Sequence, residues 1–117
     1  MATILIVEDE NQVRVFAESY LRQQGHRTLT AATVEQALAL IEAVEDVDVL
    51  FSETKLNDDE LAGVRLAKQA VRRRPGMKVV YAAEHAVTDG LKPLLGAPAA
   101  VLAKPYRTSD LKNALTR

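Results

Sequence analysis

The chain has 117 residues, of which 48% are hydrophobic, so it can build one domain with a core but is too short for two. Its net charge of −1 gives no general attraction to nucleic acid or to anionic membranes, and neither is expected as a partner. The absence of cysteine excludes disulfides and thiolate metal sites. No segment is apolar enough to span a bilayer and no basic region precedes the first strand, so we expect a cytoplasmic protein.

Apolar runs and helical patterns alternate along the chain, which is typical of βα units around a parallel sheet. The first strand is expected at residues 4–7 and the first helix at roughly residues 11–24, ending before Gly25. The side chains of this helix that are expected to face the core are Val13, Phe16, Ala17, Tyr20 and Leu21. A short second strand is expected at residues 27–30.

The middle of the chain has a well-marked helix start and a buried strand. Thr33 and Gln36 are placed as a capping box for a helix that runs to about residue 43. The third strand is expected at residues 47–52, where an apolar run indicates burial on both faces. This strand delivers Glu53 to the edge of the sheet.

The second half continues the same alternation. The remaining expected elements are a helix at residues 61–71, a strand at residues 78–82, a strand at residues 99–103 and a helix that begins near residue 108. Between residues 84 and 98, Gly90, Pro93 and Gly96 disfavour a long regular helix, so only a short or distorted one is expected. We therefore expect a single domain over residues 1–117, without an output domain.

Charged residues follow three of the expected strands at the point where each ends. Glu8 and Asp9 follow the first strand, Glu53 ends the third, and Lys104 follows the fifth. Parallel strands share a polarity, so these ends converge on the sheet edge where open α/β folds bind ligands. Three carboxylates and one lysine are therefore predicted to meet in one pocket.

This ordered set resembles the receiver domain of two-component response regulators over the whole chain. The most recognisable pieces are residues 4–10, 74–81 and 102–106. The spacing agrees with the family, since Asp9 and Glu53 are 44 positions apart and Ala82 and Lys104 are 22 apart. The resemblance implies an α/β fold with a doubly wound, five-stranded parallel sheet in the flavodoxin-like order 2-1-3-4-5 and helices on both faces. It implies signalling rather than enzymatic function.

The family's chemistry implies a role for each charged residue. In receivers, an aspartate takes a phosphoryl group from a histidine kinase, and Mg²⁺ held by acidic side chains neutralises the transferring oxygens. By similarity, Mg²⁺ would be held by Glu8, Asp9, Glu53 and the main-chain carbonyl of Lys55. Lys104 would pair with the phosphate, and the proline after it allows the cis peptide bond that is typical of the family.

Three positions depart from the family pattern. The phosphoacceptor aspartate is replaced by Glu53, which is one methylene longer, so its oxygens cannot reach the same in-line geometry. The hydroxyl residue that should close strand four is Ala82, which cannot bond a phosphoryl oxygen. The aromatic residue that moves on activation aligns with Val101. Acceptor, coupling hydroxyl and moving ring are therefore all expected to be missing.

Several functions are compatible with these residues. The first is a stand-alone receiver-like domain that binds a histidine kinase or another signalling protein through helix four, strand five and helix five. In such a domain, either Glu53 pairs with Lys104 and imitates the charge of a phosphorylated site, or Glu8, Asp9 and Glu53 repel one another. Repulsion would raise the pKa of one carboxyl or recruit a cation. The alternatives are a receiver still phosphorylated at Glu53, Ser52 or Thr54, and a small Mg²⁺-dependent phosphohydrolase.

Overall fold

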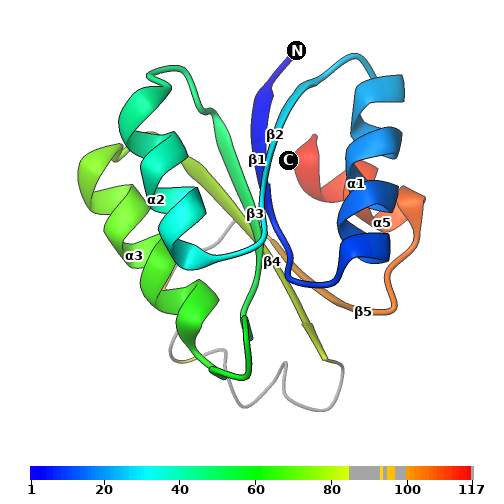
Figure 1. Cartoon of the computed structure of the whole chain (residues 1–117). Helices are drawn as coiled ribbons and strands as arrows, with labels where there is room; N and C mark the ends of the chain where they lie inside the picture. Colours follow the sequence, from blue (N-terminus) through cyan, green and yellow to red (C-terminus); the bar gives the residue numbers. More distant parts are fainter. Residues whose placement is uncertain (85–92, 94, 97–99, 117) are drawn as a thin grey trace.

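The sheet has the expected strands and order. The computed structural model describes residues 1–84, 93, 95–96 and 100–116. Five parallel strands pair in the order β2-β1-β3-β4-β5, which confirms the predicted fold class (Figure 1). The strands are β1 (Thr3–Val7), β2 (Arg27–Ala31), β3 (Val49–Glu53), β4 (Lys78–Glu84) and β5 (Ala100–Lys104).

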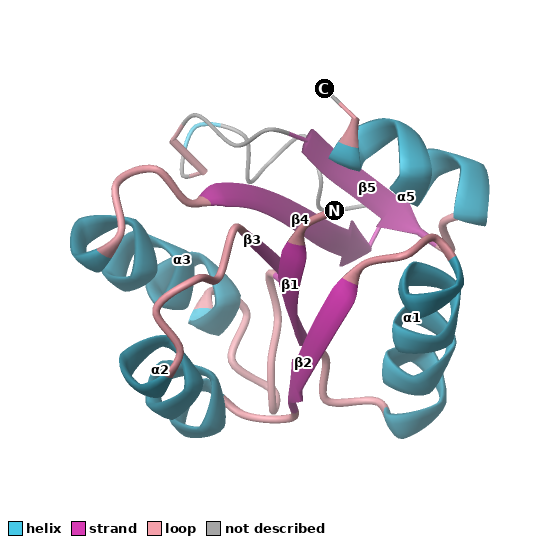
Figure 2. Cartoon of the chain, turned by 90° about the horizontal axis from the view of Figure 1, so that it is seen from above, coloured by secondary structure: helices cyan, strands magenta, loops and turns pink. Residues whose placement is uncertain are grey.

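Helices cover both faces of the sheet, so the domain has three layers. The described helices are α1 (Asn11–Gln23), α2 (Val34–Ala43), α3 (Ala62–Arg73) and α5 (Thr108–Leu115). The pair α2 and α3 lies on one face, and the pair α1 and α5 lies on the other (Figures 1 and 2). Within the described residues, no helix has the length and apolar character that crossing a membrane requires.

The central strands are apolar along their whole length because both of their faces are covered. Leu5 and Leu50 pack in the core on the α2 and α3 side. Ile4, Ile6 and Phe51 pack in a second core on the α1 and α5 side. Alternate side chains of one strand thus fill two cores, and this fixes the register that brings the strand ends together.

Two local expectations need correction. Phe16 does not face the core: 48% of it is exposed, and it lines an open pocket together with Tyr106. The buried residues of α1 are Ala17 and Leu21. The capping box on α2 is also incomplete. Thr33 accepts a hydrogen bond from the Gln36 N–H, but the Gln36 side chain accepts one from the N–H of Ala32 instead of Thr33.

The short or distorted helix expected between residues 84 and 98 lies largely outside the described residues.

Gly63 fixes how closely α3 approaches the end of β3. A Cβ atom on Gly63 would lie 1.7 Å from the carbonyl oxygen of Glu53 and 3.1 Å from the Ser52 hydroxyl. We expect Gly63→Ala to lower the free energy of unfolding by at least about 1–3 kcal/mol, because the backbone of β3 or α3 must shift. Urea denaturation measures this change.

Gly76 provides the matched control, because a Cβ atom there meets nothing within 4 Å. Gly76→Ala is expected to change the free energy of unfolding by less than about 1 kcal/mol. Equal losses in the two variants would show that the contact between α3 and Glu53 does not limit packing.

Candidate functional site

Three carboxylates gather at the carboxyl ends of β1 and β3. Single oxygens of Glu8, Asp9 and Glu53 all lie within 4.8 Å of one another. The topology explains this, since β1 and β3 are neighbours and both run toward the lower edge of the sheet in Figure 1. The predicted acidic pocket is therefore present, with Glu8 and Glu53 buried and Asp9 exposed.

Lys104, at the end of β5, brings the positive charge into this cluster. Its ammonium group donates a hydrogen bond to Oε1 of Glu53 and lies 3.4 Å from Oε1 of Glu8. The exposed fractions of the three side chains are only 14% for Lys104, 11% for Glu53 and 5% for Glu8. The lysine thus already has two carboxylate partners, both largely removed from water.

Asp9 is tied to the loop that follows β3. Its Oδ2 accepts a hydrogen bond of 2.8 Å from the main-chain N–H of Asn57. Asn57 and Asp58 have φ angles of 51° and 66°, the left-handed region that a tight turn between Leu56 and Asp59 requires. Burial opposes ionisation of Asp9, but this hydrogen bond together with those to Glu53 and Glu8 outweighs it, and the pKa of Asp9 is lowered from 3.8.

Glu53 is the group whose ionisation changes most. Burial, a hydrogen bond with Glu8 and the negative charge of Glu8 raise the pKa of Glu53 from 4.5 to about 9, although Lys104 acts in the opposite direction. For Lys104, burial favours the neutral form, but the hydrogen bond to Glu53 and the charge of Glu8 outweigh it and raise its pKa. At neutral pH the cluster therefore keeps a proton among its carboxylates.

The raised pKa of Glu53 predicts a pH dependence of stability. A carboxyl whose pKa is higher in the folded state than in the unfolded state stabilises the fold. This contribution is present in full below the unfolded pKa, and it is lost as pH rises from about 4.5 through about 9. We expect the free energy of unfolding to fall over this range in the wild type and to vary less in Glu53→Gln, which cannot ionise. Urea titrations at a series of pH values measure both curves.

The exposed residue Glu45 supplies the control for that experiment. Glu45→Gln removes one carboxyl without touching the cluster and is expected to keep the wild-type slope. Parallel curves for the wild type and Glu53→Gln would contradict the assigned ionisation of Glu53.

The remaining predicted site residues surround this cluster. Ala82 pairs with Glu53 in the sheet and is buried, with only a methyl group to offer. Val101 pairs with Tyr81 and is packed against the core on the other side of the sheet. The main-chain carbonyl of Lys55 accepts no hydrogen bond from any described residue.

Tyr106 completes the site, a role that the sequence did not reveal. Its ring packs edge to face against Phe51, with 5.6 Å between centroids and an interplanar angle of 71°. Burial, and next the charge of Glu8, raise the pKa of the Tyr106 phenol to about 12. The ring closes a cavity of about 10 Å³ beside Glu53 and Ala82, which leaves scarcely the space for one water molecule.

The donor set fits a hard divalent cation. Carboxylate oxygens and a free main-chain carbonyl are the ligands that Mg²⁺ prefers, and Glu8, Asp9, Glu53 and Lys55 would supply them. When bound, the ion would neutralise charge on transferring phosphoryl oxygens. In the present arrangement Lys104 engages Glu53 and Glu8 from within the same cluster. A bound cation would therefore compete with the ammonium group for the same oxygens.

Ser52 does not take part in this cluster. Its hydroxyl is buried and donates a hydrogen bond of 2.8 Å to the carbonyl oxygen of Glu53, beside Gly63 of α3. Alternation along β3 places Ser52 on the opposite face of the sheet from the Glu53 side chain. Ser52 is therefore poorly placed to react in the pocket.

Comparisons with known proteins agree on one family. The family model for the response regulator receiver domain matches residues 4–116. The response regulator receiver protein CpdR of Brucella abortus (strain 2308) is 27% identical over 119 residues, which span 100% of this chain and 96% of that protein. The sensor kinase CckA of the same organism is 29% identical over 86 residues, which span 73% of this chain but only 9% of the kinase.

Solved structures show the same likeness. A CheY-like response regulator receiver domain protein from Methanospirillum hungatei JF-1 superposes with a TM-score of 0.85 at 28% identity, covering 99% of this chain and 91% of that one. NtrX from Brucella abortus gives a TM-score of 0.89 at 26% identity, covering 100% of this chain and 26% of that one. The fold is thus shared with response regulator receiver proteins.

Proposed function

We propose that this chain, which belongs to the response regulator receiver domain family, serves two-component signalling through protein contacts, without accepting phosphate at Glu53 in the usual way. The observation that carries this proposal is the pairing of Glu53 with Lys104. By resemblance to the family, Lys104 is the cation that a phosphoryl group would need. Glu53 holds that cation with its own carboxylate.

The longer side chain of Glu53 explains why the pairing forms. Glutamate carries its carboxylate one methylene farther from the backbone than aspartate, and here that reach brings Oε1 into contact with the Lys104 ammonium. The two side chains are largely buried, so their attraction is screened less than at the surface. Glu8 and Glu53 both contact Lys104, so the pair still places a negative charge on the lysine when it holds one proton. A negative group on the lysine is what phosphorylation would supply, so we infer that the domain has a fixed output.

Loss of the strand-four hydroxyl supports the same conclusion. Ala82 lies directly beside Glu53 in the sheet and cannot donate to a phosphoryl oxygen. A hydrogen bond to a charged group contributes about 1.5–3 kcal/mol, so a phosphoryl group here would lack a substantial stabilising contact. Displaced attack geometry adds to this, because errors of about 1 Å can cost roughly 10²-fold in rate.

A second candidate is a receiver that is still phosphorylated at Glu53, and the retained acidic cluster is the observation in its favour. The raised pKa of Glu53 weighs against it, because a protonated carboxyl is a poor nucleophile. The third candidate, a small phosphohydrolase, is not favoured by membership of a family whose role is signalling.

For the partner, we propose a histidine kinase or another signalling protein. The likeness to a stretch of the sensor kinase CckA supports a place in a kinase pathway. The surface proposed for contact is that of helix four, strand five and helix five, of which β5 and α5 are described and the position expected for helix four lies largely outside the described residues. Since β5 ends in Lys104, this surface is joined directly to the acidic cluster.

Intact-protein mass spectrometry after incubation with acetyl phosphate and Mg²⁺ tests the proposal. We expect the wild-type chain to gain no phosphoryl group, under conditions in which a receiver with an aspartate at this position is labelled. A phosphoryl group on Glu53, located by peptide mapping, would overturn the proposal in favour of the second candidate.

A further inference from the structure

β5 is an edge strand whose outer side is open in the described structure. It pairs with β4 alone, and no backbone hydrogen bond to described residues outside the sheet involves residues 100–104. Strand geometry turns about half of its N–H and C=O groups outward, where they lack a strand partner. All five residues of β5 are partly exposed, whereas those of β1 and β3 are buried.

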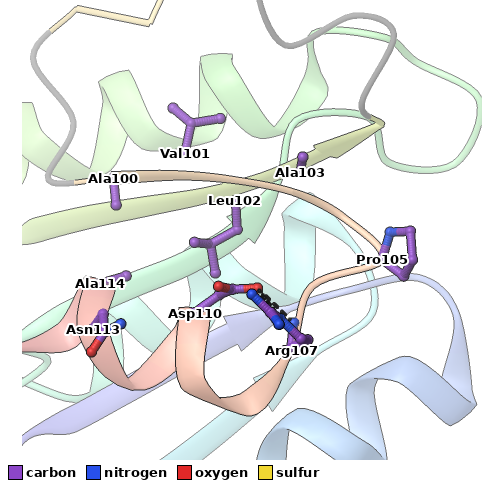
Figure 3. Close-up of a pocket in the computed structure, with 9 residues that line it drawn as sticks. All are labelled: Ala100, Val101, Leu102, Ala103, Pro105, Arg107, Asp110, Asn113 and Ala114. Atoms are coloured by element: carbon purple, nitrogen blue, oxygen red, sulfur yellow. Dashed lines mark hydrogen bonds and ion pairs between the residues drawn. The ribbon is translucent and has the colours of Figure 1, made fainter.

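A groove runs along this edge. It has a volume of about 500 Å³ and lies between β5 and α5. Figure 3 shows Val101 and Ala103 pointing to one side of the strand, and Ala100 and Leu102 to the other. Because side chains from both faces of β5 line it, the groove follows the edge itself.

The side chains around the groove leave the backbone accessible. Ala100 and Ala103 carry only methyl groups, and Ala114 does the same on α5. The polar residues Arg107 and Asp110 neutralise each other at the rim, with 3.6 Å between Nε and Oδ2. The groove thus offers apolar contacts and main-chain hydrogen bonds, with little net charge.

The opposite edge of the sheet, strand β2, is protected from pairing with another strand in the way that edge strands usually are. On β2, Arg27 pairs with Asp46, and Thr28 accepts a hydrogen bond from Arg22. Charged and hydrogen-bonded side chains of this kind discourage strand pairing. On β5 the corresponding protection is confined to Lys104 and the proline that follows it, so residues 100–103 form an unguarded apolar edge.

We propose that the groove binds an extended segment of a partner protein, which adds to β5 as a sixth strand. Only another extended chain can satisfy a row of outward N–H and C=O groups, and the small side chains allow its backbone to approach. Five residues of β5 span about 17 Å, which sets the length of the paired segment at five or six residues. Its side chains would be apolar where they face Leu102 and Ala114.

A second copy of the chain fits the edge less well. Pairing two β5 strands would bring the α5 rims of both copies together, including the exposed side chains of Arg107 and Asn113. A single extended segment enters the groove without bringing two α5 rims together.

Hydrogen exchange with a bound peptide tests this proposal. A pool of random linear peptides displayed on phage is selected against the whole chain, and the best binder is synthesised. We expect outward amides among residues 101–103 to exchange rapidly in the free protein and at least about tenfold more slowly with the peptide bound. Ala103→Lys is expected to weaken binding at least about tenfold, while Ala43→Lys, at an exposed end of α2, leaves it unchanged.

A second pair of variants guards against misfolding of the first. Asn113→Trp places a large side chain in the groove and is expected to weaken peptide binding as Ala103→Lys does. Lys112→Trp is the control: it lies on the same helix outside the groove and is expected to leave binding unchanged. The proposal would be overturned if no peptide were selected, or if the bound peptide protected amides elsewhere on the chain from exchange. It would also be overturned if the free protein were a dimer with protected β5 amides.

This inference rests on the proposed function, since it names the chemistry of the partner at the proposed contact surface. Its outcome is nevertheless separate, because no phosphodonor enters the exchange measurement. Failure to bind a peptide would not bear on whether Glu53 accepts phosphate. Phosphorylation of Glu53 would not bear on whether β5 binds a peptide.

Discussion

The double variant Glu53→Asp with Ala82→Thr is expected to take up a phosphoryl group from acetyl phosphate and Mg²⁺, at least about 100-fold faster than the wild type. The shorter carboxylate would withdraw from Lys104 and leave the lysine free for the phosphate. The threonine would restore a hydroxyl at the position that pairs with Glu53 in the sheet. Intact mass and peptide mapping measure the extent and position of labelling.

The single variants separate the two causes. Ala82→Thr alone is expected to stay unlabelled, because Glu53 still holds Lys104. Glu53→Asp alone is expected to label more slowly than the double variant, because its phosphoryl group lacks a bond worth about 1.5–3 kcal/mol. A double variant as inert as the wild type would show that position 53 does not occupy the phosphoacceptor site.

Replacing Lys104 by methionine is expected to lower the free energy of unfolding by about 3–5 kcal/mol at neutral pH. The lysine is the cation that contacts Glu53 and Glu8, and both carboxylates are buried. Its removal leaves Glu8, Asp9 and Glu53 within 4.8 Å of one another without a neutralising charge. Urea denaturation measures the loss.

A double-mutant cycle distinguishes a specific pair from general damage at position 104. Glu53→Gln combined with Lys104→Met is expected to recover part of the loss, giving a coupling energy of about 1–3 kcal/mol. Lys112→Met, at an exposed position on α5, is expected to change stability by less than about 0.5 kcal/mol. Additive effects of the two site substitutions would contradict a specific pairing of Glu53 with Lys104.

The sequence predicted the parts of the site that follow from strand polarity. Glu8, Glu53 and Lys104 each stand where an apolar strand ends, and parallel strands carry such residues to one edge whatever the loops do. Resemblance to the receiver family, and not strand polarity, assigns Ala82 to the end of strand four, and the sheet pairs it with Glu53. These inferences needed no detail of loop conformation.

Residues placed by loop conformation or by distant packing were not predictable in this way. The hydrogen bond from Asn57 to Asp9 depends on two consecutive left-handed residues, which no strand or helix period reveals. Tyr106 reaches Phe51 only after the turn that follows β5, so no strand or helix period reveals it. Phe16 matches the helical period yet is 48% exposed, because it lines an open pocket with Tyr106, which the turn after β5 brings there.

Amide NMR of the wild-type chain with Mg²⁺ and the phosphate mimic beryllofluoride tests most directly whether Glu53 has fixed the state of the domain. We expect any shifts to remain near Glu8, Asp9 and Glu53, with the amides of β5 and α5 unchanged, because the lysine already carries its negative partner. Shifts that spread along β5 and α5 at millimolar Mg²⁺ would contradict this, since they would show a switch that still responds to phosphate.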